Sequence, residues 1–350
     1  MIVPHSHTGF QPLKTCLVGQ CYPPEFFSFI HNPKLRGVFE RIAIETEEDY
    51  QALIDVLKKF NVEVIRPSIS ANFGMYLYSD QTGREVYKRP PMQPRDDMIT
   101  IGDKFYVVHN GYGENYSDPW DNFINTVDPL CLEDHRTDFD VWKKVSPPCI
   151  TRIGQDLYFD FYSHDVNFTR SKYFELLQKK IIPSYFSDYR IHYVDCGGHS
   201  DSVFAPVVPG LIVTYKSPEI YKNSFPGWEI VQVPYHDPTE NDLALRSLKA
   251  TNGKWWIKDQ ELDSELIDLV SEKFNTWTGY SIETQFDVNL LMVDQHNAII
   301  NSANPAIVSA LNRHNVNIHV VPFRHRFFWD CGLHCATLDV IREGDMVDYF

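Results

Sequence analysis

The chain has 350 residues with a formal net charge of −15 and 43% hydrophobic content, which is ample for a large buried core. An acidic chain repels phosphate backbones, so we expect no nucleic-acid partner. The first residues carry no basic stretch followed by an apolar one, and no apolar run is long enough for a membrane span. We therefore expect a cytoplasmic protein without a membrane partner.

The seven cysteines favour buried thiols over a disulfide framework, because their number is odd and no secretion signal precedes them. No two are spaced as Cys-x-x-Cys, so a zinc ribbon has little support. They are Cys16, Cys21, Cys131, Cys149, Cys196, Cys331 and Cys335.

Helix, strand and hairpin follow one another in the first third of the chain. Apolar residues at helical spacing predict an amphipathic helix over 47–60, and alternating apolar and polar residues predict a strand at 61–67. Two apolar runs on either side of Gly102 and Asp103 predict a hairpin at 98–108.

The same elements recur in the middle of the chain. A second hairpin is expected at 149–159, followed by a more loosely patterned helix at 174–180 and a strand at 189–195. A third hairpin follows at 203–213.

The last third repeats the pattern again. A strand is expected at 228–234 and a hairpin at 288–300. An amphipathic helix over 306–314, which Asn304-Pro305 begins, leads into a strand at 315–322.

Together these elements form a weak internal repeat of helix, strand and hairpin, present about five times. A single unit would leave an apolar face bare, whereas units stacked in a ring share one core and converge on an axis. We favour such an α/β ring, as a single domain over residues 1–350, over an ordinary mixed α/β domain with coincidental similarity. The stretches 111–120 and 235–241 are predicted to be long loops of the kind that often cover a site.

Reactive residues fall at equivalent places in these units. Asp96 directly precedes the first hairpin, His199 and Asp201 lie between a strand and its hairpin, and Cys335 follows the last strand. If the units form a ring, these loops meet near its axis. The sequence therefore predicts that Asp96, His199, Asp201 and Cys335 share one cleft.

This set has a chemical logic. A thiolate is a strong nucleophile that needs a nearby histidine or cation, and His199 supplies one. A guanidinium group pairs bidentately with carboxylates, which Asp96 and Asp201 supply. Two other interpretations stay open: Cys335 as simple core packing, and a divalent ion held by His199, Asp201, His334 and Cys335. No spacing matches a specific metal motif, so we expect no metal and no cofactor.

The segment Gly332-Leu-His-Cys335-Ala-Thr-Leu-Asp339 resembles the Gly-x-His-Cys-x-Thr-x-Asp signature of the glycine and inosamine amidinotransferases. These enzymes belong to the guanidino-group-modifying superfamily. Gly198-His199-Ser-Asp201 is similar to the family's His-x-Asp loop, and Pro94-Arg95-Asp96 is similar to its Arg-Asp loop. The resemblance covers most of the chain and implies the pentein fold, a five-bladed αβ propeller.

The resemblance also implies roles for these residues. Cys335 attacks the guanidino carbon, and His199 protonates the leaving amine and then deprotonates the acceptor. Asp96 and Asp201 hold the guanidinium group. Arg95 and His334, which lie within the matched motifs, are assigned to substrate binding. So is Glu283, which stands where family members place small hydroxyl residues.

The sequence departs from the family pattern in one loop. Family members carry a carboxylate that pairs with the catalytic histidine, and the matching position here is Ser146, while a second family aspartate falls on Cys149. An imidazolium formed during turnover is less stabilised without such a partner. Asp140, Asp156 and Asp160 are the candidates to replace it in space.

The leading hypothesis is therefore an amidinotransferase that takes a small guanidino donor and an amine acceptor. A cysteine-dependent hydrolase of a guanidino compound is the alternative within the same chemistry. A non-catalytic binding protein that keeps the fold is the alternative outside it. A homodimer stays open as the assembly.

Overall fold

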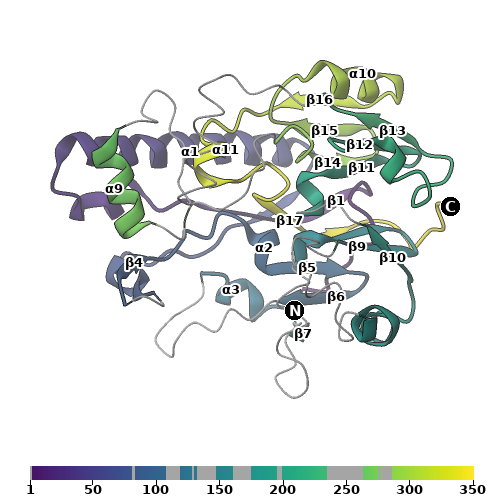
Figure 1. The fold of residues 1–350 in the computed structure, drawn as a ribbon, viewed down its shortest axis with the longest axis horizontal. Coiled ribbons are helices and arrows are strands. Elements are labelled where there is room, and N and C mark those ends of the chain that lie inside the picture. The colour runs from purple at the N-terminus through teal and green to yellow at the C-terminus, as the bar shows by residue number, and fades with distance from the viewer. Residues whose placement is uncertain are drawn as a thin grey trace.

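The computed structural model describes residues 2–80, 83–107, 119–127, 130–131, 147–160, 175–194, 199–234, 263–274, 277 and 286–350. Within these residues the fold is mixed α/β, with helices on the outside of several small sheets (Figure 1). Among these helices, none combines the length and the apolar composition needed to cross a membrane.

Five three-stranded sheets make up most of the described β structure. In each sheet the first two strands named below pair antiparallel, and the third pairs parallel to the second. The sheets are β5 (Met98–Ile101), β6 (Lys104–Val107), β7 (Leu130–Cys131); β8 (Ile150–Ile153), β9 (Asp156–Asp160), β10 (Arg190–Val194); β11 (Phe204–Val208), β12 (Leu211–Thr214), β13 (Glu229–Gln232); β14 (Leu291–Asp294), β15 (Asn297–Ile300), β16 (Asn317–Val320); and β17 (Thr337–Arg342), β1 (Leu13–Val18), β2 (Glu63–Ile65). A separate two-stranded sheet joins β3 (Leu77–Ser79) to β4 (Glu85–Tyr87).

The four predicted hairpins are present, and their tight turns explain them. Gly102, Gly154 and Gly210 occupy turns with φ of +59°, +64° and +87°, a conformation that glycine adopts without a steric penalty. At Gly154 a side chain would also collide with the chain end, because a Cβ there would lie 1.9 Å from the carbonyl oxygen of Val347.

The fifth sheet is built from the two ends of the chain. β17 pairs antiparallel with β1, with Cys16 opposite Asp339, and β1 pairs parallel with β2. The sequence repeat identified only the last of these strands, at 61–67, because β1 and β17 are far apart along the chain. Their pairing gives this sheet the same order as the other four.

The long helices pack one apolar face on the sheets. α1 (Pro33–Lys59) is capped by Asn32, whose side chain accepts a hydrogen bond from the Lys34 amide, and it begins about four turns before the predicted start at residue 47. α10 (Pro305–Arg313) begins at Asn304 as predicted. Its apolar face packs on β13 and β16 (Figure 1). α9 (Ser264–Lys273), capped by Asp263, was not predicted.

A helix is present at the described part of the segment predicted at 174–180, but it is not a regular α-helix. The described part of this segment contains a π-helical turn, η4 (Leu177–Ile181), followed by the short α7 (Ile182–Tyr185), which holds Pro183. Residues 175–185 are helical without a break, and Pro183, which has no amide hydrogen to donate, lies just after the π-helical turn. Other short helical elements are η1 (Pro24–Phe29), η2 (Phe73–Tyr76), α2 (Pro94–Asp97), α3 (Asp121–Ile124), η3 (Pro147–Cys149), η5 (Ser200–Ser202), η6 (Pro218–Ile220) and α11 (Arg326–Trp329).

Candidate active site

Cys335 lies in the turn that leads into β17, and its side chain is 3% exposed. The preceding Gly332 is needed for close packing here, because a Cβ at that position would lie 2.3 Å from Oδ1 of Asn289. The first residue of the signature segment therefore lets another side chain approach the nucleophile.

That side chain, Asn289, is a site residue that the sequence analysis missed. It is fully buried just before β14, and its Nδ2 donates to Sγ of Cys335 at 3.0 Å. Its Oδ1 accepts the backbone amides of His334 and Cys335 at 2.8 and 3.0 Å. The amide thus fixes the nucleophile's backbone and points a donor at its sulfur. No motif at 286–290 marked it, because its partners are distant in sequence.

Asp201, in η5, is the carboxylate in direct contact with the nucleophile. Its Oδ2 lies 3.4 Å from Sγ of Cys335, which donates to it, and 2.9 Å from Nδ1 of His334. Burial alone would raise the pKa of Asp201, but the hydrogen bond from His334 and the charges of His199 and Arg95 lower it below its usual range. Asp201 is therefore an ionised acceptor beside the thiol.

His334 is held as a neutral ring. Burial, followed by the positive charge of Arg95, lowers its pKa below the ordinary histidine value, although Asp201 opposes this shift. The neutral imidazole donates Nδ1–H to Asp201. Its expected role in binding substrate stays a prediction, and the contact observed here orients Asp201.

Asp96 and His199 belong to the same electrostatic group. Burial raises the pKa of Asp96, while the positive charges of His199 and Arg89 lower it and the negative charge of Asp201 raises it further. Arg89 contacts the Asp96 carboxylate loosely, at 3.7 Å. His199 is half-buried directly before η5. Of the predicted cleft, Asp201 and Cys335 are thus in contact, and His199 acts electrostatically on both Asp96 and Asp201.

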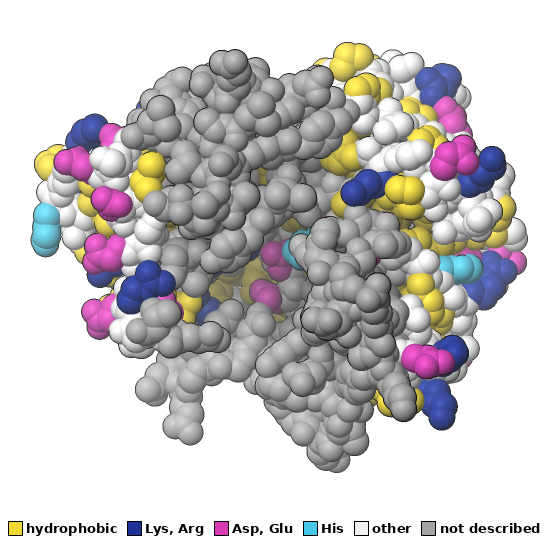
Figure 2. Space-filling view, in the orientation of Figure 1, with side chains coloured by type: hydrophobic (Ala, Val, Ile, Leu, Met, Phe, Trp, Pro, Cys, Tyr) yellow, Lys and Arg dark blue, Asp and Glu magenta, His cyan; other side chains and the backbone are white. Residues whose placement is uncertain are grey.

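Two carboxylate oxygens in this group are buried without a hydrogen-bond partner among the described residues: Oδ1 of Asp96 and Oδ1 of Asp201. Buried acceptors of this kind are nearly always satisfied in folded proteins. In Figure 2 acidic and histidine side chains lie together in a hollow near the middle of this face. The site can accept a planar cation that donates several N–H groups.

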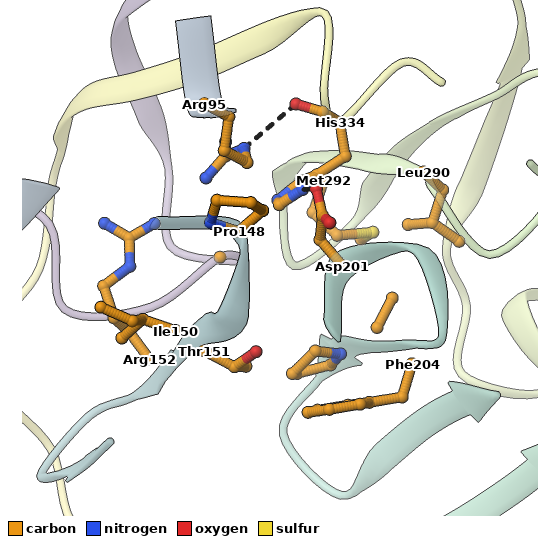
Figure 3. A pocket seen from close by; sticks show the side chains of 13 residues that line it. Arg95, Pro148, Ile150, Thr151, Arg152, Asp201, Phe204, Leu290, Met292 and His334 are labelled. Atoms are coloured by element: carbon orange, nitrogen blue, oxygen red, sulfur yellow. Dashed lines mark hydrogen bonds and ion pairs between the residues drawn. The ribbon is translucent and has the colours of Figure 1, made fainter. Parts of the chain in front are cut away.

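A cavity of about 50 Å³ lies next to Asp201 and His334. Figure 3 shows these two side chains pointing toward each other at one side, with Arg95, Arg152 and Phe204 around the space. It is large enough to hold water beside the carboxylate.

Arg95 donates hydrogen bonds to the turn that carries Cys335, and its expected contact with substrate stays a prediction. Its Nε donates to the carbonyl oxygens of His334 and Thr337, and its Nη2 donates to Asp339 at 2.8 Å. Asp339 also accepts from Arg152 and Arg342 at 2.6 and 2.8 Å. Arg95 is thus part of a buried ion cluster that holds the Cys335 turn, and its Nε and Nη2 are both bonded within the protein.

The structure shows where the candidates for the carboxylate that pairs with His199 lie. Asp156 is occupied, because its carboxylate binds Arg190 at 2.7 and 2.9 Å and His192 at 2.6 Å. Asp160 is fully buried at the end of β9. Cys149 is buried in η3. Ser146, Asp140 and Glu283 lie outside the described residues, as do the predicted loops at 111–118 and 235–241.

The alternative metal set around Cys335 does not converge in the described part of the chain. There, the histidine and carboxylate donor atoms with metal-like spacing belong instead to His5, His7 and Asp103.

Two curated proteins are similar to this chain over much of its length. Inosamine-phosphate amidinotransferase 1 of Streptomyces glaucescens is 23% identical over 346 residues, which covers 89% of this chain and 84% of that protein. L-arginine:L-lysine amidinotransferase of Pseudomonas savastanoi pv. phaseolicola is 21% identical over 246 residues, which covers 67% of this chain and 53% of that protein. No family model matches the chain.

Solved structures share the fold. An inosamine-phosphate amidinotransferase from Streptomyces griseus superposes with a TM-score of 0.65 at 18% identity, and an amidinotransferase of saxitoxin biosynthesis from Microseira wollei with 0.63 at 16%; both comparisons cover 99% of each chain. Agmatine deiminase of C. jejuni superposes with a TM-score of 0.56 at 12% identity, over 95% of this chain and 94% of the other.

Proposed function

Because the two curated relatives confirm the resemblance to the amidinotransferases of the guanidino-group-modifying superfamily, we propose that this enzyme moves an amidino group from an arginine-like guanidino donor to an amine acceptor. A covalent amidino-cysteine on Cys335 is the intermediate. The relatives act on different amines, as their names state, so the proposal specifies the chemical class of donor and acceptor.

One observation carries this proposal: Asp201, which contacts the buried thiol, and Asp96, on which the charge of Asp201 acts, each have a buried oxygen without a partner among the described residues. A guanidinium group offers N–H donors in a plane that matches two carboxylates, and its central carbon then faces the sulfur. A neutral amide has no positive charge to pair with the two carboxylates, and its N–H donors lie on a single nitrogen.

In the first step, the Cys335 thiolate attacks the guanidino carbon and a C–S bond forms. The Asn289 amide donates to the sulfur and keeps it aimed. The C–N bond to the leaving amine then breaks, and that nitrogen takes a proton from His199. The positive charge of the amidino group stays paired with Asp96 and Asp201 throughout.

In the second step, the acceptor amine gives a proton to His199 and attacks the same carbon. The C–S bond breaks, the thiolate is restored, and a new guanidino compound leaves. His199 therefore alternates between acid and base, which is the pattern of acid–base catalysis through a covalent intermediate.

We assign the missing His-pairing carboxylate to Asp160. It ends β9 in register with Val194, the last residue of β10, and the chain reaches His199 five residues later. Asp160 is fully buried at this point, and the carboxylate of Asp156 binds Arg190 and His192.

A hydrolase is the second candidate, because the fold is also similar to that of agmatine deiminase. In that case water takes the place of the acceptor amine. The two functions differ only in the second step, so the nature of the acceptor separates them.

The same proposal includes the architecture. The repeated strand order of the five sheets and the similarity to solved amidinotransferases support a five-bladed propeller of the pentein type, as a single domain over residues 1–350. We also propose a cytoplasmic location and a homodimer.

Labelling with a reactive amidine tests the site without knowledge of the natural substrate. The full chain is treated with 2-chloroacetamidine or with the neutral 2-chloroacetamide, and modification is followed by intact mass and peptide mapping. We expect Cys335 to react faster with the amidine, and Asp96→Asn to remove this preference. Equal rates with the two reagents, or labelling that persists in Cys335→Ala, would overturn the proposed site.

A second experiment identifies the reaction. Arginine and other guanidines are supplied with and without primary amines, and products are measured by mass spectrometry. Formation of a new guanidino compound only with an amine supports transfer. Release of a urea product or ammonia without an amine favours the hydrolase, and no turnover or adduct with any donor favours a binding protein.

A further inference from the structure

Two histidines near the start of the chain lie on the same side of a backbone that the fold holds firmly. Ser6 forms a two-bond bridge with Gly102 in the β5–β6 turn, with both N···O distances 2.9 Å. His5 donates its amide to Val340 of β17, and His7 accepts from the Gly154 amide at 3.0 Å. Alternate residues of an extended segment point the same way, so His5 and His7 face the same side next to Asp103.

The donor atoms of these three side chains converge. One donor atom from each of His5, His7 and Asp103 lies within 4.8 Å of the other two, and His5 Nδ1 contacts the Asp103 carboxylate directly. Ligand atoms around a tetrahedral ion at 2.0–2.2 Å lie about 3–3.5 Å apart. Asp103 is exposed, with 70% of its side chain accessible, so it can move the remaining distance.

His7 lacks a partner that its burial requires. Its side chain is 7% exposed, its Nδ1 is buried, and neither ring nitrogen has a hydrogen bond to any residue that the structure describes. A buried polar atom without a partner calls for a ligand, a water or an ion.

His5 is oriented as a metal ligand usually is. Its Nε2 donates to the carbonyl oxygen of Gly344 at 2.7 Å, which leaves Nδ1 facing the Asp103 carboxylate, as a donor when the ring is charged or as a metal ligand when it is neutral. Either a proton or a metal ion between Nδ1 and the carboxylate satisfies this pair. A backbone carbonyl on the far ring nitrogen is the common means of fixing a metal-bound histidine.

We propose that His5, His7 and Asp103 bind one divalent transition-metal ion of the zinc class. Two imidazoles and a carboxylate are the ligand set that Zn²⁺ accepts, with a fourth position open to water on the exposed side of Asp103. The ion ties the first residues of the chain to the β5–β6 turn and, through Gly344, to the last ones.

The site is separate from the proposed active site. His5 pairs with residues at the far end of β17, since the Arg342 amide donates to its carbonyl oxygen, while Cys335 precedes the first residue of this strand. The rise of an extended strand places the two about 20 Å apart. The ion therefore has a structural role, and the proposal does not depend on the amidinotransferase activity.

The test uses the full chain with Cys335→Ala, so that the active-site thiol cannot bind metal. The protein is stripped with a chelator, and Zn²⁺ binding is measured by equilibrium dialysis with elemental analysis and by the unfolding midpoint. We expect one bound equivalent and a higher midpoint with Zn²⁺. Co²⁺ bound in its place should give visible d–d bands, which report its coordination by nitrogen.

Variants locate the ion. His7→Gln and Asp103→Asn should each weaken binding by more than about tenfold, as ligand-shell changes do, and abolish the rise in midpoint. His314→Gln is the matched control, because His314 contacts Glu229 as an ordinary histidine–carboxylate pair at 2.9 Å. If His7→Gln does not fold, Asp103→Asn alone decides, since its side chain is exposed. Zn²⁺ binding that is absent in the parent, or unchanged in the variants, would show only a protonated His5–Asp103 ion pair and overturn the proposal.

Discussion

Replacing Asn289 by aspartate separates the two functions of this buried amide. The change keeps Oδ1, which accepts the amides of His334 and Cys335, and turns the Nδ2 donor into a carboxylate oxygen 3.0 Å from the Cys335 sulfur. The thiolate then faces a second negative group in addition to Asp201. We therefore expect Asn289→Asp to lower reactivity while it preserves the turn.

The expected loss of reactivity follows from the free energy of the hydrogen bond between Asn289 and the sulfur. A hydrogen bond to a charged group contributes about 1.5–3 kcal/mol. Loss of that bond to the thiolate corresponds to a rate roughly 10- to 150-fold lower. By contrast, Asn289→Ala leaves two backbone amides without their acceptor, at about 1–3 kcal/mol each, so it should reduce the free energy of unfolding by about 2–6 kcal/mol.

The assay is the second-order rate of Cys335 alkylation by 2-chloroacetamidine, measured across pH together with denaturant unfolding. Asn301→Asp is the control, because Asn301 is equally buried nearby and donates to the carbonyl oxygen of Phe286 at 2.7 Å, away from the sulfur. If Asn289→Asp alkylates within a factor of three of the wild type, the amide does not act on the thiolate and the reasoning is wrong.

Three further predictions concern carboxylates. The pKa of Asp96 is raised in the folded protein, so its ionised form lowers the free energy of unfolding above the unfolded pKa of about 4. Asp96→Asn should therefore raise the Tm of the free enzyme by about 1–3 °C at pH 7 and not at all below pH ~4, as measured by differential scanning calorimetry. The same variant should lose its selectivity for the amidine reagent. Burial opposes ionisation of Asp339, but three arginines hold its pKa well below the usual range. The stabilisation that the ionised carboxylate provides is therefore present above about pH 4 and is lost as the pH falls through the folded pKa. Asp339→Asn should lower the free energy of unfolding in urea by about 3–5 kcal/mol at pH 7, and an unchanged midpoint would contradict the ion cluster. Asp160→Asn should lower turnover by about 10²–10⁴-fold, with the fold intact by circular dichroism. Asp156→Asn should leave turnover largely unchanged. A larger loss of turnover in Asp156→Asn than in Asp160→Asn would remove Asp160 as the partner of His199.

Local sequence patterns determined much of the secondary structure and the nucleophile. The hairpins at 98–108 and 203–213 follow from alternating apolar runs around glycine turns, because short-range backbone geometry decides them. α10 follows from its Asn304 cap and apolar spacing. Cys335 was identified from its signature segment, and the contact between Asp201 and Cys335 agrees with the predicted cleft.

Tertiary structure decided the features that depend on distant residues. Asn289 donates to Cys335 across 46 positions of the sequence, and Arg95 donates to Asp339 across 244 positions. β1 and β17 form one sheet although they stand at opposite ends of the chain. A sequence pattern reports how a residue interacts with its neighbours along the backbone, whereas hydrogen bonds and ion pairs in a buried site are selected by which side chains the folded chain brings together.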